Sequence, residues 1–275
     1  MDNRHPLCEA GEMTVQAILF DLDDTLMVDE AISLSAMKET ARLAAKIHGV
    51  EVARFLADAR QLSRSLWNDN PCLAYCAGIG ITAEECLWGN FTGDAPDLIA
   101  LRVWALDFRR RLFDSILRQQ GVPDDDGTLA VEFFRARRRL QRLMPDAKET
   151  LARLKPAFKI GLLTNGAPDL QREKIAASGL AGFFDAIVVS GELGIGKPKP
   201  EIFHHLLGKL DVPPGAAVMV GNSLARDVAG ARAAGIARTV WIKVPGSEEF
   251  AETTPDHTIV GLRELPPLFL GSGNR

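Results

Sequence analysis

Apolar and polar residues alternate in two different ways along this chain. Continuous apolar runs, short enough for strands, occupy residues 17–20, 160–163, 186–189, 218–221, 239–242 and 257–260. After residue 145, the segments between these runs place their apolar residues at helical spacing instead. Continuous apolar strands that alternate with helices are typical of a parallel sheet that is buried on both faces. The pattern therefore predicts an α/β core.

The predicted helices of this core have recognisable ends. Asp146 stands in the position of an N-cap and Glu149 follows three residues later, which predicts a capping box. A second helix is expected to begin at Pro168 and end at Gly179, because proline favours the first turn and glycine the end. In a third helix, five apolar residues share one face: Ile202, Phe203, Leu206, Leu207 and Leu210.

Residues 28–144 have a different texture. Long helical patterns such as ISLSAMKETARLAAKIHGV and LIALRVWALDFRRRLFDSILRQQ fill this block, and no convincing pair of strands is evident. The strand–helix series resumes at Pro145, which indicates that a helical block is inserted after the first strand. We therefore expect a flexible tail at residues 1–12, a core formed by residues 13–27 and 145–275, and an inserted helical domain at residues 28–144.

Composition and charge narrow the range of partners. The 275 residues have a net charge of −4, and 47% are apolar and 25% charged, as in an ordinary globular protein. This balance does not indicate binding to nucleic acid or to a membrane surface. No apolar run approaches the roughly 18 residues of a membrane helix, and the first residues lack the apolar stretch of a signal peptide. We expect a cytoplasmic protein with four free thiols; its oligomeric state is not indicated.

Polar residues gather where the predicted strands end. In open parallel sheets, ligands bind beyond the carboxyl ends of the strands. The residues at those ends are, in chain order, Asp21, Asp23, Thr164, Asn165, Gly166, Lys197, Asn222 and Asp227. Since parallel strands share one carboxyl edge, these side chains are expected to converge.

Each of these residue types has a use in phosphoryl transfer. One carboxylate can attack phosphorus, and a second can move the protons of the leaving group and of water. Clustered oxygens can hold Mg²⁺, which screens the repulsion between an anionic nucleophile and phosphate. A hydroxyl, backbone N–H groups in a glycine turn and a lysine can bind phosphate oxygens. The set therefore suits the hydrolysis of a phosphate ester.

Taken singly, each residue also has an ordinary explanation. An aspartate at a strand end is often only a turn residue or a helix cap. Lys197, which precedes a proline, has the sequence context of a solvated loop lysine, and Thr-Asn-Gly is a common turn. The shared placement of all these residues at strand ends favours a common site.

Four segments resemble, in order, the four motifs of the haloacid dehalogenase-like hydrolase superfamily: FDLDDT, LLTNG, GKPKPEIF and VGNSLARDVAGARAAG. The similarity covers residues 17–28 and about 145–243. It implies a Rossmann-like parallel sheet with a mobile, all-helical cap domain inserted just after the first motif. The block at residues 28–144 matches that cap in position.

The resemblance also implies roles for individual residues. Asp21 corresponds to the nucleophile that becomes an aspartyl phosphate, and Asp23 to the general acid/base. Thr164 and Lys197 correspond to the phosphate-binding residues, and Asn165 and Gly166 adjoin Thr164 as further candidates.

The same resemblance implies a Mg²⁺ site formed by Asp21, Asp23, Asn222 and Asp227, to which Asp23 contributes its backbone carbonyl. Asn222 departs from the family pattern, because most relatives have an acidic residue there. This departure leaves the affinity for the metal open.

Asp23 separates the branches of the superfamily. Dehalogenases of this fold lack an acid two residues after the nucleophile, so the resemblance favours a Mg²⁺-dependent phosphatase that acts on a small phosphorylated metabolite. The segment TVWIKVPG and the five-residue step from Asn222 to Asp227 are similar to the branch of N-acylneuraminate-9-phosphatase and pyrimidine 5′-nucleotidases. A haloacid dehalogenase, a phosphomutase and a catalytically silent binding or regulatory protein remain as alternatives.

The inserted block contains further candidates. Two arginine-rich runs, at residues 109–111 and 135–142, are expected to be mainly solvated helix faces, although one or two arginines could reach the active site. The loop at residues 71–80 is a candidate for substrate specificity. Trp67, Trp88 and Trp104 are expected to belong to the core of the block.

Overall fold

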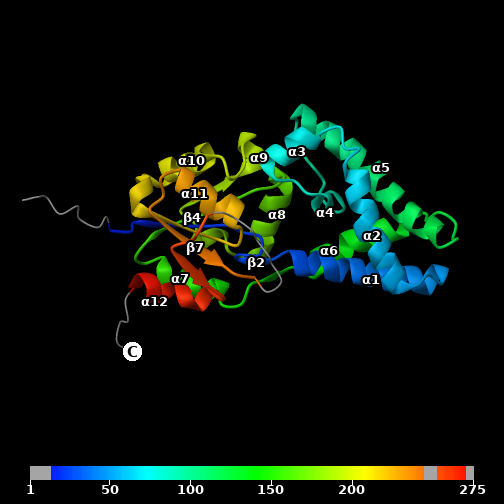
Figure 1. Ribbon diagram of the computed structural model, residues 1–275, viewed down its shortest axis with the longest axis horizontal. Helices are drawn as coiled ribbons and strands as arrows, with labels where there is room; N and C mark the ends of the chain where they lie inside the picture. Colours follow the sequence, from blue (N-terminus) through cyan, green and yellow to red (C-terminus); the bar gives the residue numbers. More distant parts are fainter. Residues whose placement is uncertain (1–13, 245–252, 271–275) are drawn as a thin grey trace, which may run out of the picture.

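The computed structural model describes residues 14–244 and 253–270, which form a sheet-centred core with a group of helices beside it (Figure 1). The helices α1 to α6 lie on the right of the view, away from the sheet. The predicted tail at residues 1–12 lies outside the described residues. The domain boundaries at residues 27 and 145 stay predictions.

The core contains a parallel sheet of six strands, and each predicted apolar run is one of them. In spatial order the strands are β5 (Ala186–Val189), β4 (Lys159–Thr164), β1 (Ala17–Phe20), β6 (Ala217–Gly221), β7 (Arg238–Ile242) and β8 (His257–Ile259). Strand β1 lies near the middle and pairs with both β4 and β6. The residues that follow β1, β4 and β6 therefore meet at one edge.

Helices cover both faces of the sheet. Alternate residues of β1 point to opposite faces, so Ile18 and Phe20 pack on one side, with α7 (Ala147–Leu154) and α12 (Leu265–Leu270). Leu19 packs on the other side, with α10 (Pro200–Leu210) and α11 (Ala229–Ala233). The buried face of α10 consists of the five predicted apolar residues. Helix α8 (Pro168–Ser178) ends at Gly179, as predicted, with φ of 66°.

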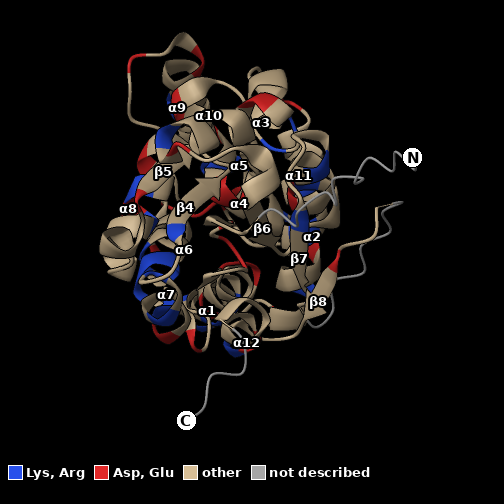
Figure 2. Ribbon diagram, turned by 90° about the vertical axis from the view of Figure 1, so that its left-hand side faces the viewer, with Lys and Arg blue, Asp and Glu red and all other residues tan. Residues whose placement is uncertain are grey.

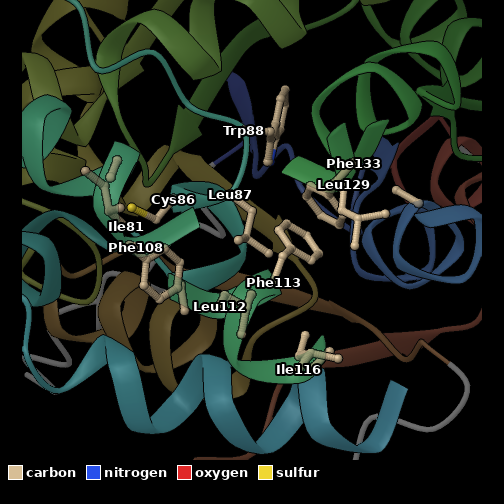
Figure 3. Close-up of a cluster of buried hydrophobic side chains, with 14 of the residues drawn as sticks. Ile81, Cys86, Leu87, Trp88, Phe108, Leu112, Phe113, Ile116, Leu129 and Phe133 are labelled. Carbon is tan, nitrogen blue, oxygen red and sulfur yellow. The ribbon is translucent and has the colours of Figure 1, made fainter. Parts of the chain in front are cut away.

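The inserted block, called the cap below, is formed by six helices. They are α1 (Glu30–His48), α2 (Val52–Trp67), α3 (Leu73–Ile79), α4 (Ala83–Cys86), α5 (Pro96–Gln119) and α6 (Thr128–Arg139). Figure 3 shows how side chains from α4, α5, α6 and the segment after α4 converge, for example Leu87 with Phe113. The cap therefore has its own apolar core.

The predicted places of the three tryptophans in the core of the cap are confirmed, and the described cysteines are free thiols, as expected. Trp88 is fully buried. Trp67 and Trp104 are partly buried against the same core, and their rings meet edge to face with their centroids 5.8 Å apart. Three cysteines are buried free thiols: Cys72, Cys76 and Cys86. Cys8 lies outside the described residues.

Two short strands join the cap to the core. Strand β2 (Met27–Val28) pairs antiparallel with β3 (Arg142–Leu143), so the chain enters and leaves the cap side by side. This pair was not predicted, because two-residue strands are too short to show a periodic pattern. The helical block thus has a small strand pair at its base.

The predicted capping box at Asp146 is wrong. Asp146 adopts a left-handed conformation with φ of 63°, and its side chain makes no capping hydrogen bond to α7. Its backbone carbonyl accepts from Thr150 N instead. A left-handed residue does not have the extended backbone from which an N-cap side chain reaches the first turn. The spacing of Asp146 and Glu149 was therefore misleading.

In residues 14–244 and 253–270, no helix is long and apolar enough to cross a membrane. Acidic and basic segments both occur on the helices around the sheet (Figure 2).

Candidate active site

A cavity of about 120 Å³ lies at the carboxyl ends of β1, β4 and β6. From the core it is lined by most of the predicted residues, namely Asp21, Asp23, Asn165, Lys197, Asn222 and Asp227. From the cap it is lined by Gly80, Thr82 and Glu85. The cavity thus lies between the sheet edge and the cap, and the predicted convergence of strand ends is observed.

Lys197 joins two carboxylates that come from different strands. Its Nζ lies 2.5 Å from Asp21 Oδ1 and 2.7 Å from Asp227 Oδ1. All three side chains are at least nine-tenths buried. Burial raises the pKa of Asp21, and Asp227 adds to that effect, whereas Lys197 opposes it. The lysine therefore offsets two negative charges at the place where a phosphate would have to approach.

The backbone around Asp227 fits this carboxylate closely. Asp227 lies in the π-helical segment η3 (Leu224–Val228), and its Oδ2 accepts from Ser223 N at 3.0 Å. A Cβ atom on Gly221, at the end of β6, would lie 2.3 Å from Asp227 Cγ. Glycine at the strand end is what allows Asp227 to turn toward Lys197.

The predicted phosphate-binding turn follows β4. Thr164 Oγ1 is buried and accepts from Gln171 Nε2 at 2.6 Å. Asn165 braces the backbone of Lys197, since its side chain accepts from Lys197 N at 2.8 Å and donates to Lys197 O at 3.0 Å. The side chain of Asn165 thus positions the lysine loop.

Gly166 connects the core to the cap. Its N–H donates to the carbonyl of Ile79, at the end of α3, and to Ser190 Oγ, both at 2.9 Å. Its φ of 138° belongs to glycine. Gly166 is not among the described residues that line the cavity. Its predicted contact with phosphate stays a prediction.

Asp23 faces a different lysine from Asp21. Both oxygens of Asp23 lie 3.0 Å from Lys174 Nζ, and Oδ2 also accepts from Gln171 Nε2 at 2.9 Å. Lys174 lies on α8 and is almost completely buried. Burial raises the pKa of Asp23 to about 6, although Lys174 lowers it. A carboxyl group with that pKa can hold or release a proton near neutral pH.

Asp24, the third acid of the first motif, serves the start of α1. Its residue is left-handed, with φ of 56°, and its carboxylate accepts from Asp29 N at 2.8 Å and Glu30 N at 3.2 Å. Burial raises its pKa to about 6. These contacts give Asp24 the role of a backbone brace where the chain enters the cap.

The cavity offers the oxygen donors that a hard cation prefers. Asp21, Asn222 and Asp227 line it together. Among the described residues, no three His, Cys, Asp or Glu side chains form a group that could hold a metal by themselves. Mg²⁺ usually takes one or two carboxylates and completes its shell with other oxygens, including water and phosphate. The donor set therefore fits Mg²⁺, provided that Asn222 and a backbone carbonyl supplement the carboxylates.

Sequence patterns did not identify the cap side of the site. Glu85 is buried, and burial raises its pKa to about 8. Glu85 and Thr82 form a capping box at the start of α4, and their spacing was a signal that could have been used. The predicted specificity loop at residues 71–80 is largely helix α3, and of that segment Gly80 lines the cavity.

The two arginine-rich runs behave in two ways. Arg110, Arg111 and Arg139 are exposed or half-buried and pair with nearby acids, as expected. By contrast, Arg137 is 1% exposed and forms a salt bridge with Asp29 beside the cavity. The expectation of mainly solvated faces therefore holds for these three arginines, and Arg137 is an exception of the kind that the expectation allowed.

Comparisons with known proteins agree with this geometry. The sequence model of the haloacid dehalogenase-like hydrolases matches residues 15–235. A phosphoserine phosphatase of Thermus thermophilus is 40% identical over 253 residues, which cover 91% of this chain and 98% of that protein. An N-acylneuraminate-9-phosphatase of Rattus norvegicus is 33% identical, covering 94% of this chain and 95% of that protein.

A solved structure is similar over nearly the whole chain. The magnesium-bound HAD hydrolase YfnB of Bacillus subtilis aligns with a TM-score of 0.62 and 21% identity, covering 93% of this chain and 99% of that one. At this identity the similarity shows the fold alone, a Rossmann-like sheet with a cap.

Proposed function

Since this chain belongs to the haloacid dehalogenase-like hydrolases and is a hydrolase of phosphoric monoesters, we propose that it is Mg²⁺-dependent and works through an aspartyl phosphate on Asp21. The observation that carries the proposal is the pair Asp21 and Asp23 at the end of β1. One carboxylate is held by Lys197 beside Asp227, and the other has its pKa raised to about 6.

The proposed reaction has two steps. In the first, a carboxylate oxygen of Asp21 attacks phosphorus, and Asp23 gives its proton to the leaving oxygen. In the second, Asp23 takes a proton from water, whose oxygen attacks the aspartyl phosphate. Inorganic phosphate leaves and Asp21 is restored. Thr164 and Lys197 hold the oxygens of the transferring group, with Asn165 fixing the lysine loop.

Mg²⁺ would be held by Asp21, Asn222, Asp227 and the backbone carbonyl of Asp23. When bound, it supplies positive charge that offsets the repulsion between phosphate and the surrounding carboxylates. Lys197 already contributes one such charge between Asp21 and Asp227.

The free thiols Cys72, Cys76 and Cys86 support a reducing, cytoplasmic location.

The substrate is proposed to be a small phosphorylated metabolite, with phosphoserine as the first candidate. The 40% identity to a phosphoserine phosphatase supports this choice. The cavity of about 120 Å³ supports it too. Sites for drug-sized ligands span roughly 300–1,000 Å³. A nine-carbon sugar acid phosphate would therefore require the cap to move. A three-carbon phosphate ester adds only a small organic group to the phosphate and needs much less additional space in the cavity.

The test is a phosphate-release screen with and without Mg²⁺. The substrates are phosphoserine, N-acylneuraminate 9-phosphate, other small phosphomonoesters and a folded phosphoprotein, with Asp21→Asn as the blank. We expect Mg²⁺-dependent release from phosphoserine or another small ester, at a rate well above that from the phosphoprotein, because the cap covers the cavity.

Three results would contradict the proposal. Halide release from 2-haloacids without metal would favour a dehalogenase. Return of the phosphoryl group to another position of the substrate, in place of free phosphate, would favour a mutase. Binding without turnover across the whole screen would favour a silent regulatory protein.

A further inference from the structure

The ammonium group of Lys174 lies at the centre of a buried cluster of charges between core and cap. Its Nζ lies 3.0 Å from both oxygens of Asp23 and 3.0 Å from Asp29 Oδ1. It lies 3.8 Å from Glu85 Oε1. An ammonium group has three protons to donate. The contacts with Asp23 and Asp29 therefore account for its hydrogen-bonding capacity.

The partners of Lys174 come from separate parts of the chain. Asp23 follows β1, Asp29 precedes α1 at the base of the cap, and Glu85 lies in α4. Arg137 of α6 also contacts Asp29, and both cations lie over the ring of Trp88, at 4.4 Å for Arg137 and 5.5 Å for Lys174. One core lysine thus connects a core carboxylate with groups that belong to the cap.

The orientation of Asp23 is fixed by these contacts. Both of its oxygens contact Lys174, and one also accepts from Gln171. The same Gln171 amide donates to Thr164 Oγ1 at 2.6 Å, so Asp23 and the phosphate-binding turn share a hydrogen-bond donor. A carboxyl group acts as a general acid only where its oxygen lies within reach of the leaving group.

We propose that Lys174 is a positioning residue that orients the carboxyl group of Asp23 toward the leaving oxygen. Through Lys174, this orientation depends on the position of the cap. The inference rests on the proposed role of Asp23 as acid and base. Lys174 acts through Asp23 and does not itself contact the substrate. Asp29 holds the lysine from the cap side, so a displaced cap changes the position of Asp23 through Lys174.

The leaving group separates positioning from general structural support. An aryl phosphate such as p-nitrophenyl phosphate releases a stable phenolate with little need for a proton, whereas an alkyl phosphate such as phosphoserine needs one. Loss of general acid catalysis costs about 10²–10⁴-fold. The value of kcat/KM reports the transfer step, which precedes hydrolysis of the aspartyl phosphate. It is therefore the quantity to compare between the two substrates.

The experiment measures kcat/KM on both substrates for wild type, Asp23→Asn and Lys174→Met. Lys155→Met is the matched control, because Lys155 also holds a carbonyl and a carboxylate, those of Phe183 and Asp185, away from the cavity. For Lys174→Met we expect a loss of about 100-fold with the alkyl phosphate but less than about fivefold with the aryl phosphate. Lys155→Met should leave the ratio unchanged.

A buried cluster that loses one cation can unfold. The double variant Lys174→Met with Asp29→Asn removes one charge of each sign, and circular dichroism verifies its fold. We expect the same selective loss in this variant. If the single or the double variant lowers kcat/KM equally for both substrates, Lys174 is only a structural cation and the inference is wrong.

Asp23→Asn distinguishes failure of the inference about Lys174 from failure of the proposed function. Selective loss in Asp23→Asn, without selective loss in the Lys174 variants, overturns the inference and keeps the proposed function. If Asp23→Asn itself lowers both substrates equally, the acid role of Asp23 is wrong, and the role of Lys174 falls with it.

Discussion

Asp21 and Asp23 lie two residues apart, yet each faces its own buried lysine in a differently built environment. Asp21 meets Lys197 and Asp227, which follow other strands of the core. Asp23 meets Lys174, which it shares with Asp29 at the base of the cap and with Glu85 inside it. The charged partners of Asp21, the proposed nucleophile, thus belong to the core, whereas those of Asp23, the proposed acid/base, include groups of the cap.

This difference assigns separate tasks to the two parts of the molecule. A strand end held in the middle of a sheet gives Asp21 a fixed position, which suits a group that must attack phosphorus in line. A proton donor has to match a leaving group that changes with the substrate. In the proposed mechanism, partners that lie partly in the cap would let substrate binding influence the protonation of Asp23 without disturbing Asp21.

The largest effect is expected from replacing Asp21, whose charged partners belong to the core. Asp21→Asn keeps the size of the side chain and removes the attacking charge, so phosphate release should fall by at least about three orders of magnitude. Asp24→Asn is the control, because Asp24 braces the start of α1. Turnover above a tenth of wild type in a clean Asp21→Asn preparation would rule out the covalent mechanism.

On the cap side, Glu85 is expected to make the free energy of unfolding depend on pH. Glu85 has its pKa raised by burial from 4.5 to about 8, so the folded protein holds a proton that the unfolded chain releases. Protonation of Glu85 in the folded protein therefore contributes to the free energy of unfolding. This contribution is fully present below pH 4.5 and is lost as pH rises through 8, at up to about 1.4 kcal/mol per pH unit. Glu85→Gln cannot ionise and should remove that slope.

Urea unfolding of wild type and Glu85→Gln at pH 6 and pH 8 measures the effect. Wild type should lose about 2–3 kcal/mol more than the variant between the two pH values. Glu84→Gln, at an exposed position in the same helix, should keep the wild-type slope. Identical slopes in wild type and Glu85→Gln would mean that Glu85 is already ionised in the folded protein at pH 6.

A pair of glycines measures how closely the cap contacts the core. Gly80 and Gly49 both end a helix in the left-handed conformation, so replacement by alanine strains both about equally. A Cβ on Gly80 would lie 2.8 Å from Asn165 Cβ, whereas one on Gly49 meets nothing within 4 Å. We expect Gly80→Ala to lower kcat/KM about tenfold, because Asn165 holds the Lys197 loop.

In the same assay, Gly49→Ala should keep near-wild-type activity and lose only stability. Equal loss of activity in the two variants would show that the contact between Gly80 and Asn165 has no part in catalysis.

The smallest effect is expected at Asn222, which lines the cavity on the core side. Its amide oxygen is neutral, so Asn222→Asp should lower the Mg²⁺ concentration for half-maximal activity by a fewfold, and Asp227→Asn should raise it. A Mg²⁺ titration of phosphate release compares the three proteins. An unchanged midpoint in Asn222→Asp would mean that residue 222 does not bind the metal directly.

Sequence reasoning predicted where polar residues meet when those residues follow a strand. The convergence of Asp21, Lys197 and Asp227 on one cavity could be predicted because each comes after a recognisable apolar run, and parallel strands bring their carboxyl ends together. The buried face of α10 followed from helical spacing in the same way. In these cases local sequence determines position directly.

The acid/base environment could not be predicted in this way. Lys174 lies 151 residues from Asp23, in a helix where a lysine normally faces solvent. Its burial depends on how the cap sits against α8, which no local pattern records. The contact of Arg137 with Asp29 and the approach of Glu85 to Lys174 also join distant segments of the chain. Partners that meet between the cap and the core leave no periodic signal in either segment.

The position of β1 also has a consequence in time. Its partners β4 and β6 begin at residues 159 and 217, beyond the entire cap. At roughly 5–20 residues per second, a ribosome needs on the order of 10–40 seconds to advance from β1 to β6. In the cap, α1 packs against α6 and α2 against α5, so these contacts lie within residues 30–139 and can form during that interval. Asp21 and Asp23 therefore leave the ribosome just after a strand that is still unpaired, and Asp21 meets Lys197 and Asp227 only when most of the chain has been made.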